Sequence, residues 1–250
     1  MLSALLITLR EGFEAALLIG ILLAAVRRGG GSSRSIWVGA AAAAGVSLIA
    51  GAALFASGRE LTGTSEQLFE AGAALIAAGF LTWMLFWMRD HAAGSASRLS
   101  ERAGAALATG GAALAWLAFA AVVREGFETA LFLFAAPGEG GFAAVLGALA
   151  GLAVATALGV AVYRGASRLD LGLFFKITGA LLVVFAAYLL FGAVGELGEI
   201  FGGEAFEVLG PLVAVVYVAI AGWLYLRPRR PAQRSDDLPP RHHVLPAARL

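Results

Sequence analysis

The residues best suited to chemistry occur in two matching runs of eight. REGFEAAL at residues 10–17 recurs as REGFETAL at residues 124–131, and seven of the eight positions are identical. Each run holds one arginine and two glutamates: Arg10, Glu11 and Glu14 in the first, and Arg124, Glu125 and Glu128 in the second. Residues three or four apart share one face of a helix, so the charges of each run form one stripe.

The four glutamates predict a metal site. Glu11, Glu14, Glu125 and Glu128 supply up to eight oxygen atoms, which suit hard ions such as Fe³⁺, Mn²⁺, Mg²⁺ or Ca²⁺ better than soft Cu⁺. The arginine of each run is expected to tune the site, because a neighbouring guanidinium favours the ionised carboxylate. Two arginines leave a formal charge of minus two, which a bound cation would neutralise. Purely structural ion pairs between the helices are the alternative, and they leave that charge unexplained.

The phenylalanine and glycine of each run allow a simpler expectation. Gly12 and Gly126 lack a side chain, so another helix or the hydration shell of an ion can come close to them. Phe13 and Phe127 are expected to pack outward, away from the charged stripe.

The rest of the chain is too apolar for a soluble protein. Of its 250 residues, 60% are hydrophobic and 14% are charged, and its mean hydropathy is +0.85. Soluble domains are about one-quarter charged, so we expect most of this chain to lie in lipid. A charge at the centre of a membrane helix costs at least about 2.5 to 3.5 kcal/mol, and such charges are functional by default. The two charged runs are therefore the candidate site.

Seven long apolar runs predict an all-α, polytopic membrane protein with about seven transmembrane helices. The runs are continuous instead of alternating, which indicates helices and not the strands of a barrel. They lie at residues 2–26, 36–56, 67–88, 107–136, 142–163, 173–192 and 208–226. Residues 1–226 are expected to form one transmembrane domain, and residues 227–250, rich in proline and charge, a mobile cytoplasmic tail.

The basic residues predict the orientation of the chain. Fifteen of the eighteen Lys and Arg residues fall in the tail or in connections on one side of the predicted bundle, and that side is expected to be the cytoplasm. The N-terminus then lies outside and the C-terminus inside. The composition is rich in Ala, Gly and Arg, with Lys176 as the only lysine, and is typical of a GC-rich bacterial source. This predicts a cytoplasmic (inner) membrane location.

The repeated run also predicts internal symmetry. Its copies lie in the first and fourth predicted helices, which the chain enters from opposite sides of the membrane. We therefore expect inverted three-helix repeats, helices one to three and four to six, followed by a seventh helix. In secondary transporters with inverted repeats, the cargo binds near the midplane between the two halves.

A second acidic group is predicted on the outer side. The connection after the sixth predicted helix contains Glu196, Glu199, Glu204 and Glu207 and no basic residue. Four more outward acids are Glu60, Glu66, Glu70 and Glu139, against the single basic residue Arg59. This excess would concentrate cations at an entrance. An ordinary solvated loop is the alternative.

Several classes of site are disfavoured by the residues that the sequence lacks. It has no cysteine, and its three histidines, His91, His242 and His243, lie in hydrophilic stretches. Haem ligation and histidine-based metalloenzyme sites within the helices are therefore not expected. We expect no permanently bound cofactor, no enzymatic activity and no nucleic-acid partner.

The two R-E-x-x-E motifs, in the first and fourth of seven predicted helices, resemble those of the high-affinity iron permease family. This family includes the oxidase-dependent iron transporters of fungi and their bacterial ferrous-iron-uptake relatives. The segment from Trp83 to Arg89 and the run from Glu196 to Glu199 are similar to the family as well. The resemblance implies a permease that moves iron into the cell through the motif glutamates. It further implies that external oxidation supplies Fe³⁺, with an extracytoplasmic oxidase or iron-binding protein as partner besides membrane lipid.

Residue chemistry alone leaves other functions open. Another cation such as Mn²⁺ or Pb²⁺ would suit the same carboxylates, and an anion bound by Arg10 and Arg124 could be carried with protons on the glutamates. An intramembrane hydrolase could use paired glutamates as acid and base, but metal-dependent versions usually have histidine ligands. A purely structural scaffold would tolerate apolar replacements of all six charged residues.

Overall fold

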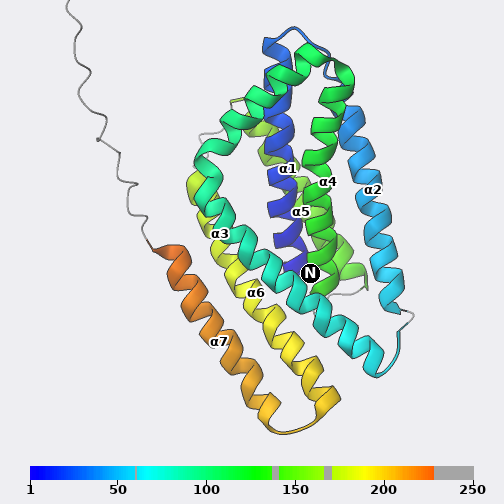
Figure 1. The fold of residues 1–250 in the computed structure, drawn as a ribbon, viewed down its shortest axis with the longest axis vertical. Coiled ribbons are helices and arrows are strands. Elements are labelled where there is room, and N and C mark those ends of the chain that lie inside the picture. The colour runs from blue at the N-terminus through cyan, green and yellow to red at the C-terminus, as the bar shows by residue number, and fades with distance from the viewer. Residues whose placement is uncertain (60, 137–140, 166–170, 228–250) are drawn as a thin grey trace, which may run out of the picture.

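The computed structural model describes residues 1–59, 61–136, 141–165 and 171–227, and this part of the chain is all-helical. Seven helices in the described part follow one another across a bundle (Figure 1). They are α1 (Leu2–Arg28), α2 (Arg34–Arg59), α3 (Thr64–Thr109), α4 (Gly111–Ala135), α5 (Gly141–Tyr163), α6 (Leu171–Phe201) and α7 (Ala205–Leu226). The tail expected from residue 227 onward lies outside the described residues, apart from Arg227.

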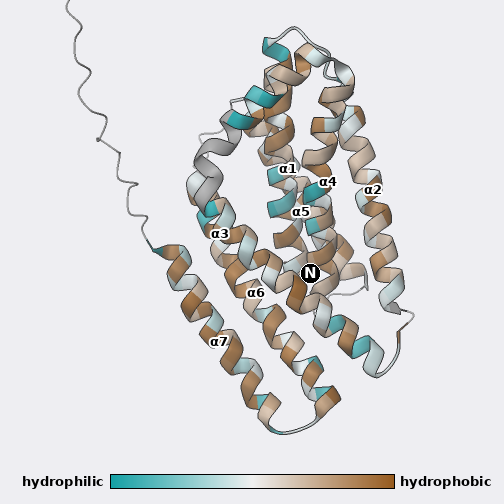
Figure 2. Ribbon diagram, viewed as in Figure 1, coloured by the Kyte–Doolittle hydropathy of each residue, from teal (hydrophilic) through white to brown (hydrophobic). Residues whose placement is uncertain are grey.

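The chain is a multi-pass membrane protein. Among the described residues, five stretches are long and apolar enough to cross a membrane, and they lie in α2, α3, α5, α6 and α7. The remaining helices, α1 and α4, carry the two charged runs. Figure 2 shows these runs as hydrophilic bands near the middle of two otherwise mostly apolar helices. The seven predicted apolar runs thus correspond to seven helices, and five of them meet the criterion for a span.

The helices pack in pairs that are far apart in sequence. The most extensive helix contacts join α1 to α5, α2 to α4, and α3 to α6. α7 lies against α6 at the edge of the bundle (Figure 1). α1 also packs against α4 and α3, so the two charged helices meet inside the bundle.

Small residues permit the close pairing of α5 with α1. On α5 the buried positions recur every four residues, at Gly147, Gly151, Ala155 and Gly159. A Cβ atom at Gly151 would collide with the Leu5 carbonyl oxygen and the Thr8 hydroxyl of α1. Helices without side chains at the contact approach closely, which is the usual basis of association in lipid.

Two apolar clusters lie on either side of the charged runs. One contains the fully buried side chains of Ile7, Leu81, Phe132 and Leu189, toward the end of the bundle where α1 begins. The other contains Leu22, Val26, Ile36, Ala103 and Leu114, toward the opposite end.

α3 is longer than predicted. The sequence predicts a span at residues 67–88 and then a connection, but the helix continues to Thr109. Its second part crosses the ends of α1 and α4 (Figure 1), where Ala103 is fully buried and Leu99 packs against the second cluster. Gly110, with φ of 124°, ends the helix in a conformation that favours glycine. The predicted fourth span, from residue 107, therefore began within α3.

α6 also extends beyond its predicted end. The sequence places Glu196 and Glu199 in an outer loop, whereas both lie in the last turns of α6. The actual connection is a tight turn in which Gly202 and Gly203 have positive φ angles of 68° and 116°. Glu204 is the N-cap residue of α7, and Glu207 lies in its first turn.

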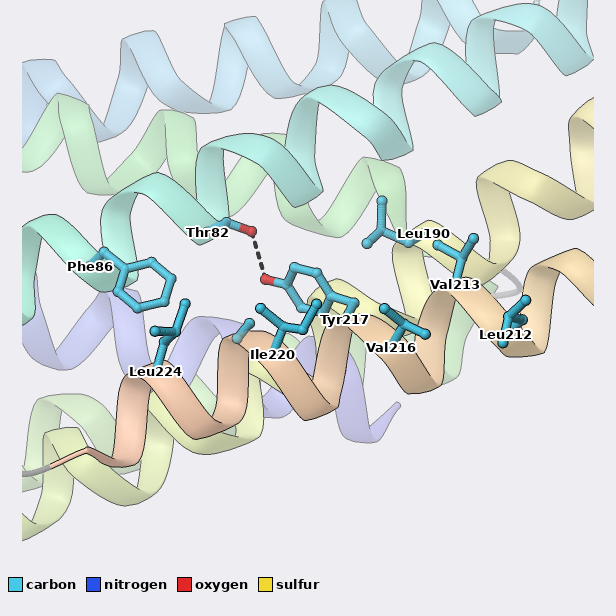
Figure 3. Close-up of a pocket in the computed structure, with 10 residues that line it drawn as sticks. Thr82, Phe86, Leu190, Leu212, Val213, Val216, Tyr217, Ile220 and Leu224 are labelled. Atoms are coloured by element: carbon cyan, nitrogen blue, oxygen red, sulfur yellow. Dashed lines mark hydrogen bonds between the residues drawn. The ribbon is translucent and has the colours of Figure 1, made fainter.

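α7 leaves an apolar groove where it faces α3. The groove has a volume of about 530 Å³, and Phe86, Leu190, Val216 and Ile220 are among the residues that line it (Figure 3). The hydroxyl groups of Thr82 and Tyr217 are 2.6 Å apart and form a hydrogen bond across it. Polar contacts of this kind join helices in lipid.

Candidate metal site

The arginine of α1 is buried between its two neighbouring glutamates. Arg10 Nη1 donates a hydrogen bond of 2.6 Å to Glu11 Oε1, and Nη2 lies 2.9 Å from Glu14 Oε1. Arg10 is 2% exposed, Glu11 is 0% exposed and Glu14 is 6% exposed. The helical spacing therefore produces the predicted stripe, and the stripe faces the interior of the bundle.

The second run forms the corresponding pairs with a different exposure. Arg124 Nε donates to Glu128 Oε1 at 2.9 Å, and Nη2 lies 3.4 Å from Glu125 Oε1. Both glutamates are buried, but the Arg124 side chain is 45% exposed. Its guanidinium lies 5.8 Å from the centre of the Trp87 ring of α3, a cation–π contact.

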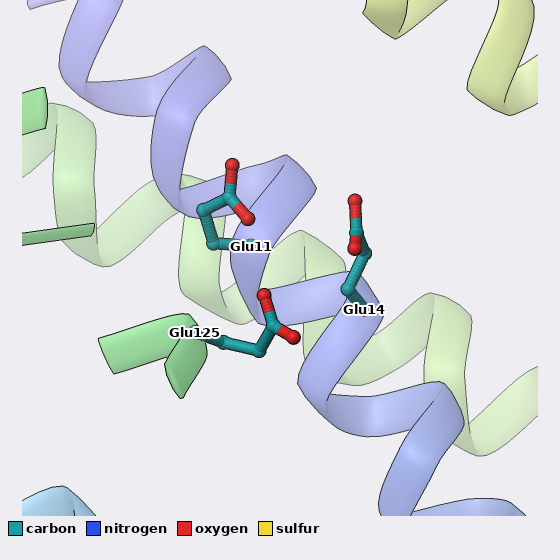
Figure 4. Close-up of side chains that lie close together, drawn as sticks. All are labelled: Glu11, Glu14 and Glu125. Carbon is teal, nitrogen blue, oxygen red and sulfur yellow. The ribbon is translucent and has the colours of Figure 1, made fainter. Parts of the chain in front are cut away.

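Three of the four predicted carboxylates converge on one point. Oxygen atoms of Glu11, Glu14 and Glu125 lie within 4.8 Å of one another, and Figure 4 shows these side chains meeting between α1 and α4. Glu128 is outside this group; Arg124 binds its Oε1 atom, and it is close enough to interact electrostatically with Glu11 and Glu14.

Several of these oxygen atoms have no hydrogen-bond partner among the described residues. They are Oε2 of Glu11, Glu125 and Glu128 and Oε1 of Glu14, all buried, and of these Glu14 Oε1 is ion-paired with Arg10. A buried carboxylate oxygen without a donor is costly, and usually indicates a ligand, a proton or a water molecule. The four glutamates and two arginines together carry a formal charge of minus two, so a cation would satisfy both the free oxygens and the charge.

Two methionines at this site were missed by the sequence analysis. Arg10 Nη2 lies 3.0 Å from Met88 Sδ, and Nη1 lies 3.8 Å from Met84 Sδ. Both come from α3, four residues apart, and they are two of only three methionines in the chain. The sequence could have indicated them by their spacing of four residues, which places both on one helix face within the segment from Trp83 to Arg89.

The neighbours of the charged runs differ between the two copies. Gly12 packs against Leu152 and Ala155 of α5, and a Cβ atom at Gly126 would collide with the Ser47 hydroxyl of α2. Both glycines therefore allow another helix to come close, which is one of the two roles expected from the sequence. Ser47 Oγ is buried without a partner among the described residues, and the sequence analysis did not single it out.

The expectation that both phenylalanines pack outward is wrong for Phe13. Phe127 is 47% exposed, but Phe13 is fully buried, and its ring centre lies 4.5 Å from that of Phe174 in α6. The reason is that α1 is surrounded by α3, α4, α5 and α6, whereas α4 has a free side.

A cavity of about 1070 Å³ leads from the carboxylates to one end of the bundle. Arg10, Glu14, Arg124 and Glu125 line its inner part. Its other lining residues include Tyr163, Lys176 and Arg227, which belong to the last residues of α5, the first turns of α6 and the end of α7. The site is therefore accessible from the end of the bundle that carries basic residues.

The predicted acidic entrance lies at the opposite end, and part of it comes together. Gln67 of α3 donates a hydrogen bond of 2.8 Å to Glu199, and Glu66 and Glu70 act electrostatically on Glu196. Glu204 and Glu207 are near the start of α7. Glu60 and Glu139 lie outside the described residues. Among the residues lining the cavity there is no member of this acidic group.

Comparisons with known proteins identify the family. The sequence profile described as "Iron permease FTR1 family" matches residues 1–208. The chain belongs to the FTR1 iron permease family. Both R-E-x-x-E runs and α1 to α6 lie within the matched region.

Curated relatives include proteins named as iron permeases. "Ferrous iron permease EfeU" of Escherichia coli O6:K15:H31 (strain 536 / UPEC) is 38% identical over 200 residues, which cover 78% of this chain and 72% of the relative. The protein of the same name from Yersinia pestis is 36% identical over 200 residues, 78% of this chain and 71% of the relative. An uncharacterized protein of Archaeoglobus fulgidus is 38% identical over 211 residues, 83% of this chain and 74% of the relative. No solved structure shows a significant match.

Proposed function

We propose that this chain is an iron uptake permease of the cytoplasmic membrane whose cargo binds at Glu11, Glu14 and Glu125, with Glu128 beside them. The observation that carries the proposal is the convergence of three buried carboxylates, with partnerless oxygen atoms, between two membrane helices. Family membership and the names of the EfeU relatives support iron as the cargo. Carboxylate oxygens bind iron and can release it when they are protonated or move apart.

The path of the ion follows from the charges at the two ends. Glu66, Glu70, Glu196 and Glu199 would attract cations from outside, and the cluster around Ile7, Leu81 and Phe132 separates them from the site. The cavity opens at the basic end, which we assign to the cytoplasm by the positive-inside rule. In this assignment the structure is an inward-facing state, with the N-terminus outside.

Inverted repeats would explain how access alternates. Helices α1 to α3 and α4 to α6 are the two proposed repeats, and α7 is an addition. The packing supports this division, because α1 lies against the second helix of the other repeat, α5, just as α4 lies against α2. α3 and α6, the third helices, also pack against each other. Movement of one repeat against the other would open the apolar layer and close the cavity.

The valence of the ion determines which partners are needed. The carboxylates accept Fe³⁺ as well as Fe²⁺. Transport of Fe³⁺ from a supply of Fe²⁺ requires an extracytoplasmic oxidase, as the resemblance to the oxidase-dependent transporters implies, whereas transport as Fe²⁺ requires none. An iron-binding protein outside the membrane could serve either form.

Radioactive iron uptake into proteoliposomes tests the proposal. Fe²⁺ kept reduced and Fe³⁺ held by citrate are supplied separately to the wild type and to Glu11→Gln. We expect uptake of at least one valence, and a fall of at least about tenfold in the variant, since loss of supporting groups alone costs a metal site that much. Glu101→Gln is the control, because Glu101 is exposed on α3 away from the site. Equal uptake by wild type and Glu11→Gln would reject the carboxylate site.

A further inference from the structure

The Arg10 guanidinium is surrounded by four atoms of kinds that can bind metal ions. Nη1 contacts Glu11 Oε1 at 2.6 Å and Met84 Sδ at 3.8 Å, and Nη2 contacts Glu14 Oε1 at 2.9 Å and Met88 Sδ at 3.0 Å. Two carboxylate oxygens from α1 and two thioether sulfurs from α3 thus surround one buried positive charge. Arg10 and Met84 are 2% and 1% exposed, so this position is buried.

The chemistry of the two thioether sulfurs points to metal binding more than to stabilisation of Arg10. A methionine sulfur is a weak hydrogen-bond acceptor, so it does little to stabilise a guanidinium. As metal ligands, however, sulfur donors favour softer ions, and a thioether is a known axial ligand of iron in cytochromes. A set of two oxygens and two sulfurs suits Fe²⁺ better than Fe³⁺, Mn²⁺ or Mg²⁺.

We propose that Arg10 holds the place of the transported ion, and that Met84 and Met88 are ligands that make the site select ferrous iron over harder ions. This inference rests on the proposed function, because it assumes that iron is the cargo. When the ion arrives, the guanidinium leaves the four ligands, and the ion takes its position beside Glu125.

The surroundings of Arg10 permit this exchange. Its side chain lines the large cavity together with Met88, Arg124 and Glu125, so open space adjoins the guanidinium. Its Nε atom has no hydrogen-bond partner among the described residues. Glu11 and Glu14 keep a positively charged partner throughout, because one cation replaces another between them.

Substitution of the methionines separates ligation from packing. Leucine nearly preserves the volume of methionine and has no sulfur. We expect Ag⁺ to inhibit Fe²⁺ uptake by the wild type, and Met84→Leu/Met88→Leu to weaken that inhibition at least about tenfold. Inhibition by Mn²⁺ should be unchanged or stronger in the variant. Leu85→Ile, a packing change on the same helix, is the control and should keep wild-type inhibition by Ag⁺.

A spectroscopic measurement tests the ligands without relying on transport. Selenomethionine labelling places selenium only at Met1, Met84 and Met88, because the chain has three methionines. X-ray absorption at the selenium edge should then detect a metal neighbour when Fe²⁺ or Ag⁺ is added. The Glu11→Gln variant should show a weaker signal from this metal neighbour. Absence of a metal neighbour, or unchanged Ag⁺ inhibition in a folded double-leucine variant, would overturn the inference. Iron uptake that depends on Glu11 in the same preparation would leave the proposed function standing.

Discussion

At the scale of single residues, two identical motifs have acquired different environments. Arg10 is enclosed by carboxylates and methionines, whereas the Arg124 side chain is 45% exposed toward the cavity. Removing one partner of a fully buried ion pair leaves an uncompensated charge and costs about 3 to 5 kcal/mol, while exposed pairs contribute about 0 to 1 kcal/mol. The two arginines should therefore differ in their effect on stability, although their sequences do not distinguish them.

Glutamine in place of each arginine measures this difference. We expect Arg10→Gln to lower the thermal unfolding midpoint in detergent clearly more than Arg124→Gln, because Arg10 is buried together with its two glutamates, whereas solvent already screens the pairs of the 45% exposed Arg124 side chain. Equal shifts for the two variants, or a larger one for Arg124→Gln, would show that burial of Arg10 does not determine its contribution.

The sequence was informative about charged residues and silent about their neutral neighbours. The four glutamates stand out in an apolar chain, and three of them do converge. Glu128 lies outside that group, and the sequence does not distinguish it from the other three, because packing determines the rotamer of a long side chain. Met84 and Met88 are apolar residues in an apolar helix, so only the three-dimensional approach of α3 to α1 distinguishes them.

At the scale of elements, small residues determine which helices pair. Gly151 of α5 is in contact with the backbone of α1, so even one methyl group has no room there. Gly45 of α2, by contrast, has open space where a Cβ atom would be placed. The same substitution should therefore have opposite consequences at these positions.

Alanine at each glycine tests the pairing of α1 with α5. We expect Gly151→Ala to reduce thermal stability and the yield of folded protein, because backbone atoms of α1 must shift. Gly45→Ala should be neutral or stabilising by about 0.4 to 1 kcal/mol, since it restricts only the unfolded chain. Wild-type stability of Gly151→Ala would contradict the observed contact.

The limits of the helices were harder to predict than their existence. Each predicted apolar run corresponds to one helix of the described part, and five of these helices are long and apolar enough to span a membrane. The apolar runs missed the extensions of α3 and α6, which carry polar residues and therefore resemble loops. Leu99 and Ala103 pack against α1, α2 and α4. This tertiary contact stabilises the helical conformation of α3 beyond the point where the hydropathy falls.

At the scale of the whole molecule, the bundle is polarised. Acidic residues such as Glu66 and Glu199 are at one end, basic residues such as Arg34 and Arg102 are at the other, and the cavity opens to the basic end. The proposed orientation and the inward-facing state both depend on which end meets the cytoplasm.

Introduced cysteines test that orientation without background, because the natural chain has none. Thr62 lies in the exposed connection between α2 and α3, and Ser33 lies in the exposed connection between α1 and α2. A thiol reagent that cannot cross membranes should label Thr62→Cys in intact cells with a permeabilised outer membrane. It should label Ser33→Cys only after the inner membrane is opened, and the reverse pattern would invert the assignment.

Equilibrium binding of iron to the purified chain tests the central claim most directly, because it measures the site apart from driving force, partners and orientation. Under anaerobic conditions in detergent, the wild type and Glu101→Gln should bind Fe²⁺ with the same affinity. Glu11→Gln/Glu125→Gln should bind it at least about tenfold more weakly while remaining folded. Equal binding by the double variant and the wild type would contradict the account, because the ion would then be held somewhere other than between α1 and α4.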